Sequence, residues 1–259
     1  RKAFKRGRAF VRVARPGLGD DVAARDNAAL REAGQRLSGT RDAEVLVQTL
    51  DKLVARKSSG LQASDVAGLR ELLVAERDAQ HATARSAKGT IAEVLDLLDV
   101  VVQDIGGWTL GPEPAADLAA GFDRILRKGR RALRDAHQSH GEERTEALHE
   151  LRKRSKDLWH AAELLEVAAP PEMQALQEQA HQLADYLGDG NDLSVLELRV
   201  QGADPDVFPT PAIGDALMSA ISARRGKLER KAMNLADDVH SGRHKALVRA
   251  VRGLDHPAS

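Results

Sequence analysis

Basic side chains recur at helical spacing along four segments of the chain, and rows of this kind can bind phosphate groups. One row comprises His149, Arg152, Lys153, Lys156 and His160. Residues three or four positions apart lie on the same side of an α-helix, so these five side chains share one face. Arginine binds phosphate oxygens through paired hydrogen bonds, and lysine acts as a point charge. The pattern therefore predicts a cationic helix face suited to a phosphate-rich ligand.

Three further segments carry the same type of face. Residues 1–15 contain seven basic residues and no acid, and residues 122–137 and 224–231 also have more bases than acids. The candidate binding residues in these segments are Arg1, Lys2, Lys5, Arg8, Arg12, Arg127, Lys128, Arg130, Arg131, Arg134, Arg224, Lys227, Arg230 and Lys231. The formal net charge of the whole chain is zero, so the remaining residues are acidic on balance. A solvated surface is the plain alternative for any one basic helix, but four such segments favour binding.

The sequence lacks the patterns that would carry catalysis or hold a metal ion. It has no cysteine, which excludes a thiolate metal site and a cysteine nucleophile. It contains no glycine-rich phosphate loop, no nucleophile elbow and no His-Glu-x-x-His motif. Paired carboxylates that would hold Mg²⁺ for phosphoryl transfer are not found in a basic context. We therefore expect a protein with no catalytic residue, no metal and no cofactor.

The histidines were weighed separately, because histidine serves both as a metal ligand and as an acid or base. His149 has cationic neighbours that disfavour a metal ion, so it would be either a phosphate contact or a structural hydrogen-bonding group. The pairs His137 with His140 and His240 with His244 have spacings found in metal sites. Each pair crosses an expected helix end, and the sequence therefore favours surface histidines.

Helical periodicity runs through most of the chain and positions these residues. Hydrophobic residues make up 42% of the sequence and aromatic residues only 3%, which favours an all-α fold. The expected helices cover roughly 1–15, 22–37, 41–57, 64–87, 90–104, 116–137, 144–167, 172–187, 191–200, 212–240 and 243–253. Asp42 and Asp192 would then begin helices, where a carboxylate satisfies free N–H groups. No apolar run is long enough to cross a membrane and no signal peptide is visible, so we expect a cytoplasmic protein that does not bind membranes.

An internal repeat organises the chain. Arg1-Lys2-x-x-Lys5 recurs as Arg152-Lys153-x-x-Lys156, and the stretch 37–46 recurs at 187–196. The two offsets, 151 and 150 residues, are nearly equal. The repeat predicts a duplicated unit within one domain over residues 1–259, with halves at 1–115 and 116–259. The predicted fold is two pseudo-symmetric antiparallel helical bundles of about four helices each.

The motif His149-Glu150-Leu151-Arg152-Lys153, followed by Lys156 and Trp159, resembles the signature of the CHAD family, the conserved histidine α-helical domains. The stretches 122–133 and 187–196 resemble further motifs of the same family. The resemblance implies two helical bundles with a basic groove between them that binds inorganic polyphosphate, in some members on polyphosphate granules with possible protein partners there. It also implies a first-half histidine three residues before Arg1, which lies outside this chain.

Three alternatives remain at this stage. A helical RNA- or DNA-binding protein would use similar basic faces, but few aromatic residues lie near them for base stacking. A phosphohydrolase, its accessory domain or a polyphosphate kinase would need metal-binding carboxylates. A protein-interaction scaffold would use the acidic remainder of the chain. The sequence favours polyphosphate over nucleic acid and predicts neither the preferred chain length nor the oligomeric state.

Overall fold

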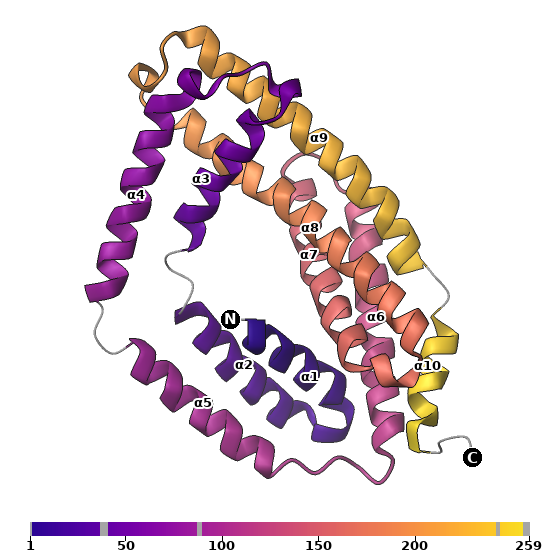
Figure 1. Cartoon of the computed structure of the whole chain (residues 1–259). Helices are drawn as coiled ribbons and strands as arrows, with labels where there is room; N and C mark the ends of the chain where they lie inside the picture. Colours follow the sequence, from indigo (N-terminus) through magenta and orange to yellow (C-terminus); the bar gives the residue numbers. More distant parts are fainter. Residues whose placement is uncertain (1, 37–40, 87–89, 242–243, 256–259) are drawn as a thin grey trace. The chain divides into compact units, whose positions relative to one another are not determined.

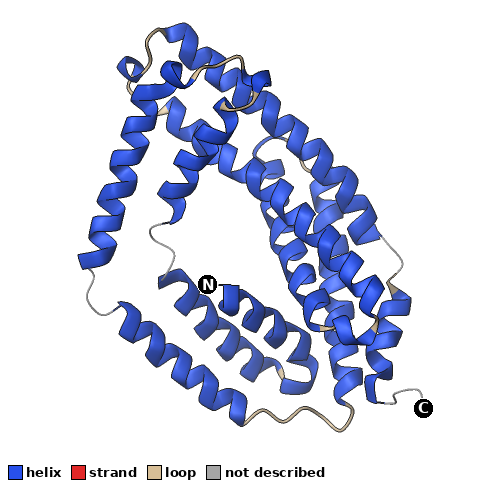
Figure 2. Cartoon of the chain, viewed as in Figure 1, coloured by secondary structure: helices blue, strands red, loops and turns tan. Residues whose placement is uncertain are grey.

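The computed structural model describes residues 2–36, 41–86, 90–241 and 244–255. Within these ranges the regular elements are helices and no strand is present, which confirms the all-α class (Figure 2). The α-helices are α1 (Lys2–Leu18), α2 (Asp20–Arg36), α3 (Arg41–Val54), α4 (Ala67–Ser86), α5 (Thr90–Gly106), α6 (Pro114–Gln138), α7 (Gly141–Leu164), α8 (Pro170–Gln201), α9 (Pro211–Ser241) and α10 (Lys245–Arg252). Short 3₁₀ turns occupy Lys57–Ser59, Ala63–Val66, Glu166–Ala168, Pro205–Val207 and Gly253–Asp255. None of the helices described combines the length and apolar character needed to span a membrane.

The helices labelled in Figure 1 belong to two compact units. Unit 1 comprises Arg1–Arg36, Thr90–Asp185 and Met233–Ser259, and unit 2 comprises Leu37–Gly89 and Tyr186–Ala232. Helices α8 and α9 therefore each contribute residues to both units. The two segments of unit 2 are related by the 150-residue repeat, because residues 37–82 of the first segment correspond to residues 187–232 of the second. The halves 1–115 and 116–259 and their pseudo-symmetry stay predictions.

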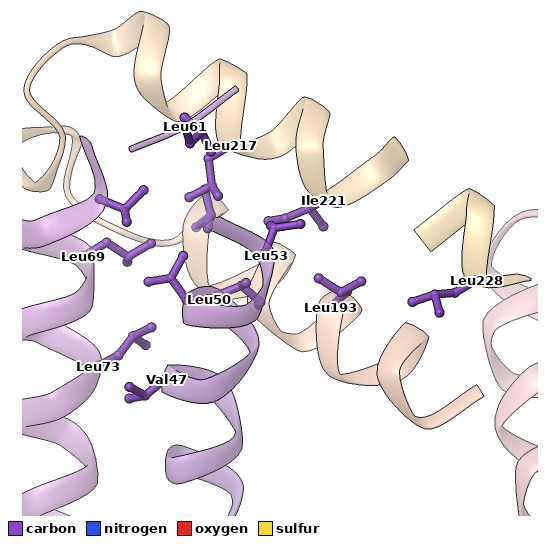
Figure 3. Packing of buried hydrophobic residues seen from close by; sticks show 13 residues of the cluster. Val47, Leu50, Leu53, Leu61, Leu69, Leu73, Leu193, Leu217, Ile221 and Leu228 are labelled. Carbon is purple, nitrogen blue, oxygen red and sulfur yellow. The ribbon is translucent and has the colours of Figure 1, made fainter. Parts of the chain in front are cut away.

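The core of unit 2 is a cluster of aliphatic side chains from four helices (Figure 3). Leu50 of α3, Leu69 of α4 and Leu217 and Ile221 of α9 are fully buried. Leu193 of α8 lies in the same cluster. Burying a side chain of this size stabilises the fold by roughly 2 kcal/mol. This core holds together helices that are distant in the sequence.

Unit 1 is built around contacts of α1 with α2, α6 and α7. Gly121 of α6 lies where the backbones of α1 and α6 meet. A Cβ atom added at Gly121 would lie 1.8 Å from the carbonyl oxygen of Val13, so only glycine permits this approach. Leu151 and Leu158 of α7 are fully buried, as the expected apolar face of that helix requires. The polar sides of α1, α6 and α7 are thereby left for charged residues.

Two expected helix boundaries are wrong and one is confirmed. Helix α8 continues through residues 187–191, so Asp192 lies in the interior of a helix and not at its start. Gly188 and Gly190 each weaken a helix by about 1 kcal/mol, but Leu193 and neighbouring apolar residues are buried along α8 and offset this cost. Helix α1 also extends beyond Pro16, which falls in its last turn. Helix α3 begins at Arg41, as predicted, and Asp42 is in its first turn.

Candidate functional site

Helices α1 and α7 run antiparallel within unit 1, and this arrangement brings two of the predicted basic segments together. Arg6 of α1 forms an ion pair with Glu163 of α7, and Arg12 forms one with Asp157. From Arg6 to Arg12 the residue number along α1 rises by six, while the number of the paired acid on α7 falls by six, from 163 to 157. The same register places Arg15 opposite Arg154. Segments separated by about 150 residues in the sequence therefore form one surface.

Helix α6 adds a third row of cations to this surface. Lost solvation lowers the pKa of the Lys128 ammonium, and repulsion from Arg124, Arg154 and Arg15 lowers it further. Burial likewise lowers the pKa of the half-buried Arg8, with Arg12 as the largest repelling charge. We define the α1–α6–α7 cluster as the cations Arg8, Arg12, Arg15, Arg124, Lys128 and Arg154 together with the acid Asp157. Burial is the largest cause of both lowered pKa values, and repulsion among cations from three helices adds to it.

Asp157 is the buried acid of the cluster. Its carboxylate accepts hydrogen bonds from Arg12 and, at 2.9 Å, from Arg154 Nη1. Only 8% of Asp157 is exposed, so both arginines are oriented by a group with little contact to water. Its negative charge also favours the charged forms of Arg8 and Lys128. One carboxylate therefore holds together cations contributed by all three helices.

The cluster keeps an excess of positive charge. Besides Asp157, its acid partners are Asp20, which accepts a 2.6 Å hydrogen bond from Arg15, and Glu150, which accepts one of 2.7 Å from Arg154. In the described part of the chain, Arg8, Arg124 and Lys128 form no ion pair within 4.0 Å. The Arg8 Nε donates instead to the neutral side chain of Asn27, at 3.2 Å. Three cations are thus available to an anionic ligand.

The remaining predicted residues of unit 1 are distributed over other surfaces. Arg1 lies outside the described residues, and the side chain of Lys2 is not described. Lys5, Arg131 and Arg134 are exposed, and Lys156 is half-buried. Three of the cations have acids of their own helices as partners: Arg127 lies 3.2 Å from Asp123, Arg131 lies 4.0 Å from Asp135, and Lys153 lies 2.8 Å from Glu150. These are surface pairs of small energetic value.

Residues on the predicted face of α7 differ in their surroundings. His149 is half-buried. The Nε of Arg152 is buried and has no hydrogen-bond partner among the described residues. His160 is buried, and its Nδ1 lies 3.2 Å from Glu163, the acid that also binds Arg6. Burial lowers the pKa of His160 more than Glu163 raises it. Whether any of the three contacts phosphate stays a prediction.

Unit 2 contains a second, smaller group of basic residues. Burial lowers the pKa of the half-buried Arg224, and Arg56 is the largest repelling charge. Lys231 lies over the ring of Tyr186, with 5.6 Å from Nζ to the ring centroid, which favours the cation through the ring electrons. Lys227 and Arg230 are exposed. Arg56 was not among the sequence candidates, because residues 41–57 have no marked basic excess.

The predicted set of binding residues did not include Arg15, Arg124 and Arg154. All three belong to the predicted basic segments, and Arg15 and Arg124 even continue the helical rows of α1 and α6. That continuity was the available signal. Arg154 lies off the row of Arg152 and Lys156, and its signal was its spacing of four residues from Glu150 and three from Asp157, which favours ion pairs along α7.

His240 is buried, so its interpretation as a surface histidine is wrong. The Ser155 hydroxyl donates to the carbonyl oxygen of Leu151 at 2.8 Å and lies 3.2 Å from His240 Nε2, so we assign the imidazole proton to Nε2, donating to Ser155. A Cβ atom at Gly129 would lie 2.4 Å from His240 Nδ1, so glycine provides the room for the ring. Burial, with smaller contributions from His244 and Arg130, lowers the pKa of His240 to about 4. The neutral ring thus packs between α6 and α7.

The other pair comprises His137 and His140. His137 is exposed, as expected of a surface histidine, and its Nε2 lies 2.8 Å from Oδ1 of Asp237. Among the described residues, no group of three or more His, Asp or Glu side chains is arranged to hold a metal ion.

These features define an all-helical protein with a cationic surface formed by three helices around a buried carboxylate. A comparison with known protein families matches residues 1–201 to the CHAD domain. The match covers more than half of the 259 residues, and the chain belongs to the CHAD domain family. A search of curated proteins found no match.

Proposed function

We propose that this protein binds inorganic polyphosphate without catalysing a reaction, and that the α1–α6–α7 cluster is the principal contact. The observation that carries the proposal is the gathering of six cations around one buried carboxylate, Asp157. Three of these cations have no ion-pair partner among the described residues. An anionic ligand would offset the repulsion that lowers the pKa values of Arg8 and Lys128.

The spacing of the cations suits a linear polyanion. Arg8, Arg12 and Arg15 follow one another at intervals of four and three residues, which is about 6 and 4.5 Å along a helix axis. Polyphosphate presents negative charge at every phosphate and has no base to be recognised. Arginine side chains can contact its oxygens in pairs. Binding should weaken steeply as salt increases, because each neutralised phosphate releases a counterion.

RNA is the second candidate, and the aromatic residues discriminate against it. Phe10 and Trp108 stack on each other with ring centroids 5.6 Å apart, and Trp159 stacks on His181 at 3.7 Å. Rings engaged in this way are not free platforms for nucleotide bases, on which single-stranded RNA binding commonly depends. We further propose that the protein lies in the cytoplasm, on polyphosphate granules, where other granule proteins are its partners.

The test is a titration of the whole chain with long-chain polyphosphate, a single-stranded RNA and ATP at several salt concentrations, with an assay for released phosphate. Exchanging Arg124 and Lys128 for glutamine should weaken polyphosphate binding at least about tenfold and reduce the slope of log affinity against log salt by about 0.7 per lost contact. Lys52→Gln, an exposed site of unit 2, is the control and should leave both unchanged.

Three outcomes contradict the proposal. RNA binding as tight as polyphosphate binding would favour the second candidate, and phosphate release would show that the protein is an enzyme. Unchanged polyphosphate affinity in the Arg124 and Lys128 variant, with the fold retained by circular dichroism, would move the site away from the cluster.

A further inference from the structure

A separate pocket lies in unit 1 where α10 packs against α6. Its volume is about 430 Å³, which falls within the range of small-molecule sites. The lining residues are Asp123, Leu126 and Arg130 of α6 together with His244, Lys245, Val248, Arg249 and Arg252 at and along α10. Asp123, Leu126 and Arg130 belong to the basic segment 122–137, whereas the five residues at and along α10 lie outside every basic segment that the sequence indicated. The pocket therefore depends on α10, which contributes no residue to the α1–α6–α7 cluster.

The walls of this pocket are cationic. Lys245, Arg249 and Arg252 are spaced by four and three residues, so they form one row about 10 Å long on α10. Arg130 of α6 completes the set. In the part of the chain that the structure describes, none of the four cations forms an ion pair. The single acid of the lining, Asp123, already lies 3.2 Å from Arg127.

The electrostatic influence of these groups extends into the protein. Both His244 and Arg130 contribute to lowering the pKa of the buried His240. The Nε2 of His244 lies 2.9 Å from the carbonyl oxygen of Val239, which fixes the ring at the edge of the pocket. Several unpaired cations facing one small volume favour an anion with more than one negative charge. Phosphate fits the paired donors of the arginines.

The remaining lining of the pocket is aliphatic. Leu126 is buried, with 2% exposed, and Val248 is half-buried. Val251 is fully buried and anchors the apolar side of α10. Among the described residues, no Phe, Tyr or Trp side chain lines the pocket, so its stacking surface for a nucleotide base is limited to the His244 imidazole. An aliphatic ligand body can instead cover Val248 and the methylene groups of the lining lysine and arginine side chains, which stabilises binding by removing apolar surface from water.

From this combination we propose that the α6–α10 pocket binds a phosphate monoester with an aliphatic body, at a site distinct from the α1–α6–α7 cluster. The phosphate contacts Arg249 and its neighbours in the cationic row, and the aliphatic body lies on Val248 and the methylene groups of the lining lysine and arginine side chains. Either a soluble alkyl phosphate or the headgroup of phosphatidic acid has this chemistry. The proposal does not depend on polyphosphate binding.

The test uses the whole chain and isothermal titration calorimetry with n-hexyl phosphate and with inorganic phosphate. Hexyl phosphate should bind at least about tenfold more tightly, because several methylene groups leave water. Arg249→Gln should weaken hexyl phosphate binding about tenfold, since it removes a charged hydrogen-bonding group. The matched control Lys52→Gln removes one positive charge from unit 2 and should have no effect. In a second arm, sedimentation with phosphatidylcholine vesicles, with and without phosphatidic acid, distinguishes a lipid from a soluble ligand.

Binding in either arm that Arg249→Gln weakens and Lys52→Gln does not supports the site. The proposal is overturned if neither hexyl phosphate nor phosphatidic acid binds. It is also overturned if the hexyl chain adds no affinity in solution and phosphatidic acid vesicles do not bind. The third contradicting result is unchanged ligand binding by the Arg249→Gln variant. Arg249 is exposed, so its exchange should not disturb folding, which thermal unfolding can verify. Polyphosphate affinity of Arg249→Gln, measured in parallel, should stay within about twofold of the unaltered chain. That measurement separates failure of this proposal from failure of the polyphosphate proposal.

Discussion

Replacing Asp157 with asparagine should weaken the fold and strengthen polyphosphate binding, because this carboxylate neutralises cations that the ligand would otherwise use. Its side chain is 11% exposed, and the side chains of its partners Arg12 and Arg154 are 28% and 23% exposed. Removing one member of a fully buried ion pair costs about 3–5 kcal/mol. Because both arginines reach water, we expect a smaller loss, of about 2 kcal/mol in the free energy of unfolding.

The effect on binding has the opposite sign. A carboxylate about 8 Å from a bound phosphate repels it by roughly 1 kcal/mol where the effective dielectric constant is about 40. The Asp157→Asn exchange should therefore raise polyphosphate affinity about fivefold. Up to two released arginines should also make the slope of log affinity against log salt steeper by about 0.7 to 1.4. Urea unfolding measures the stability, and titration at several salt concentrations measures the binding.

Asp135→Asn, on α6 of unit 1 and outside the cluster, is the matched control. Asp135 is 58% exposed and lies 4.0 Å from Arg131, so its exchange should change the free energy of unfolding by less than about 0.5 kcal/mol. The reasoning is refuted if Asp157→Asn unfolds like the unaltered chain and binds polyphosphate more weakly with a flatter salt dependence. Asp157 would then neither stabilise the cluster nor compete with the ligand.

Three further predictions concern the frame of the site. Gly121→Ala should lower the free energy of unfolding by more than about 2 kcal/mol, since its Cβ meets a backbone carbonyl of α1. Gly190→Ala, with open space around it in α8, should leave the free energy of unfolding unchanged or raise it by about 0.5–1 kcal/mol. Urea unfolding measures both effects. Because the pKa of His240 is lowered in the folded chain, the unfolded chain takes up a proton more readily than the folded one. The free energy of unfolding therefore has its full value above pH 6.5 and falls by about 3 kcal/mol as the pH drops towards 4. His240→Gln should reduce this pH dependence in unfolding curves measured across the same range. Arg56→Gln should raise the pKa of Arg224 by removing repulsion. If the unit 2 cations contact polyphosphate, this variant should bind polyphosphate about threefold more weakly in the same titration. Unchanged polyphosphate affinity would restrict the binding site to unit 1.

Local periodicity determined the helical class, and the sequence motifs determined the family. The rows of basic residues on α1, α6 and α7 could be recognised because helical spacing depends only on near neighbours. The same local signals are weak at helix ends. Gly188 and Gly190 indicated a break in α8 that packing of its apolar side overrides.

Only the tertiary structure decided which rows meet and which glycines matter. The antiparallel register of α1 and α7 brings Arg12 against Asp157, and no spacing within either helix specifies that contact. The contact of Asp157 with Arg154 joins residues three apart on α7. Gly121 is required because another backbone lies against it, and Gly129 because the His240 ring does. Charge and periodicity are properties of a segment, whereas burial, pKa and close approach depend on neighbours that are distant in the sequence. The sequence therefore indicated a cationic protein surface, and packing selected the cations that form the site.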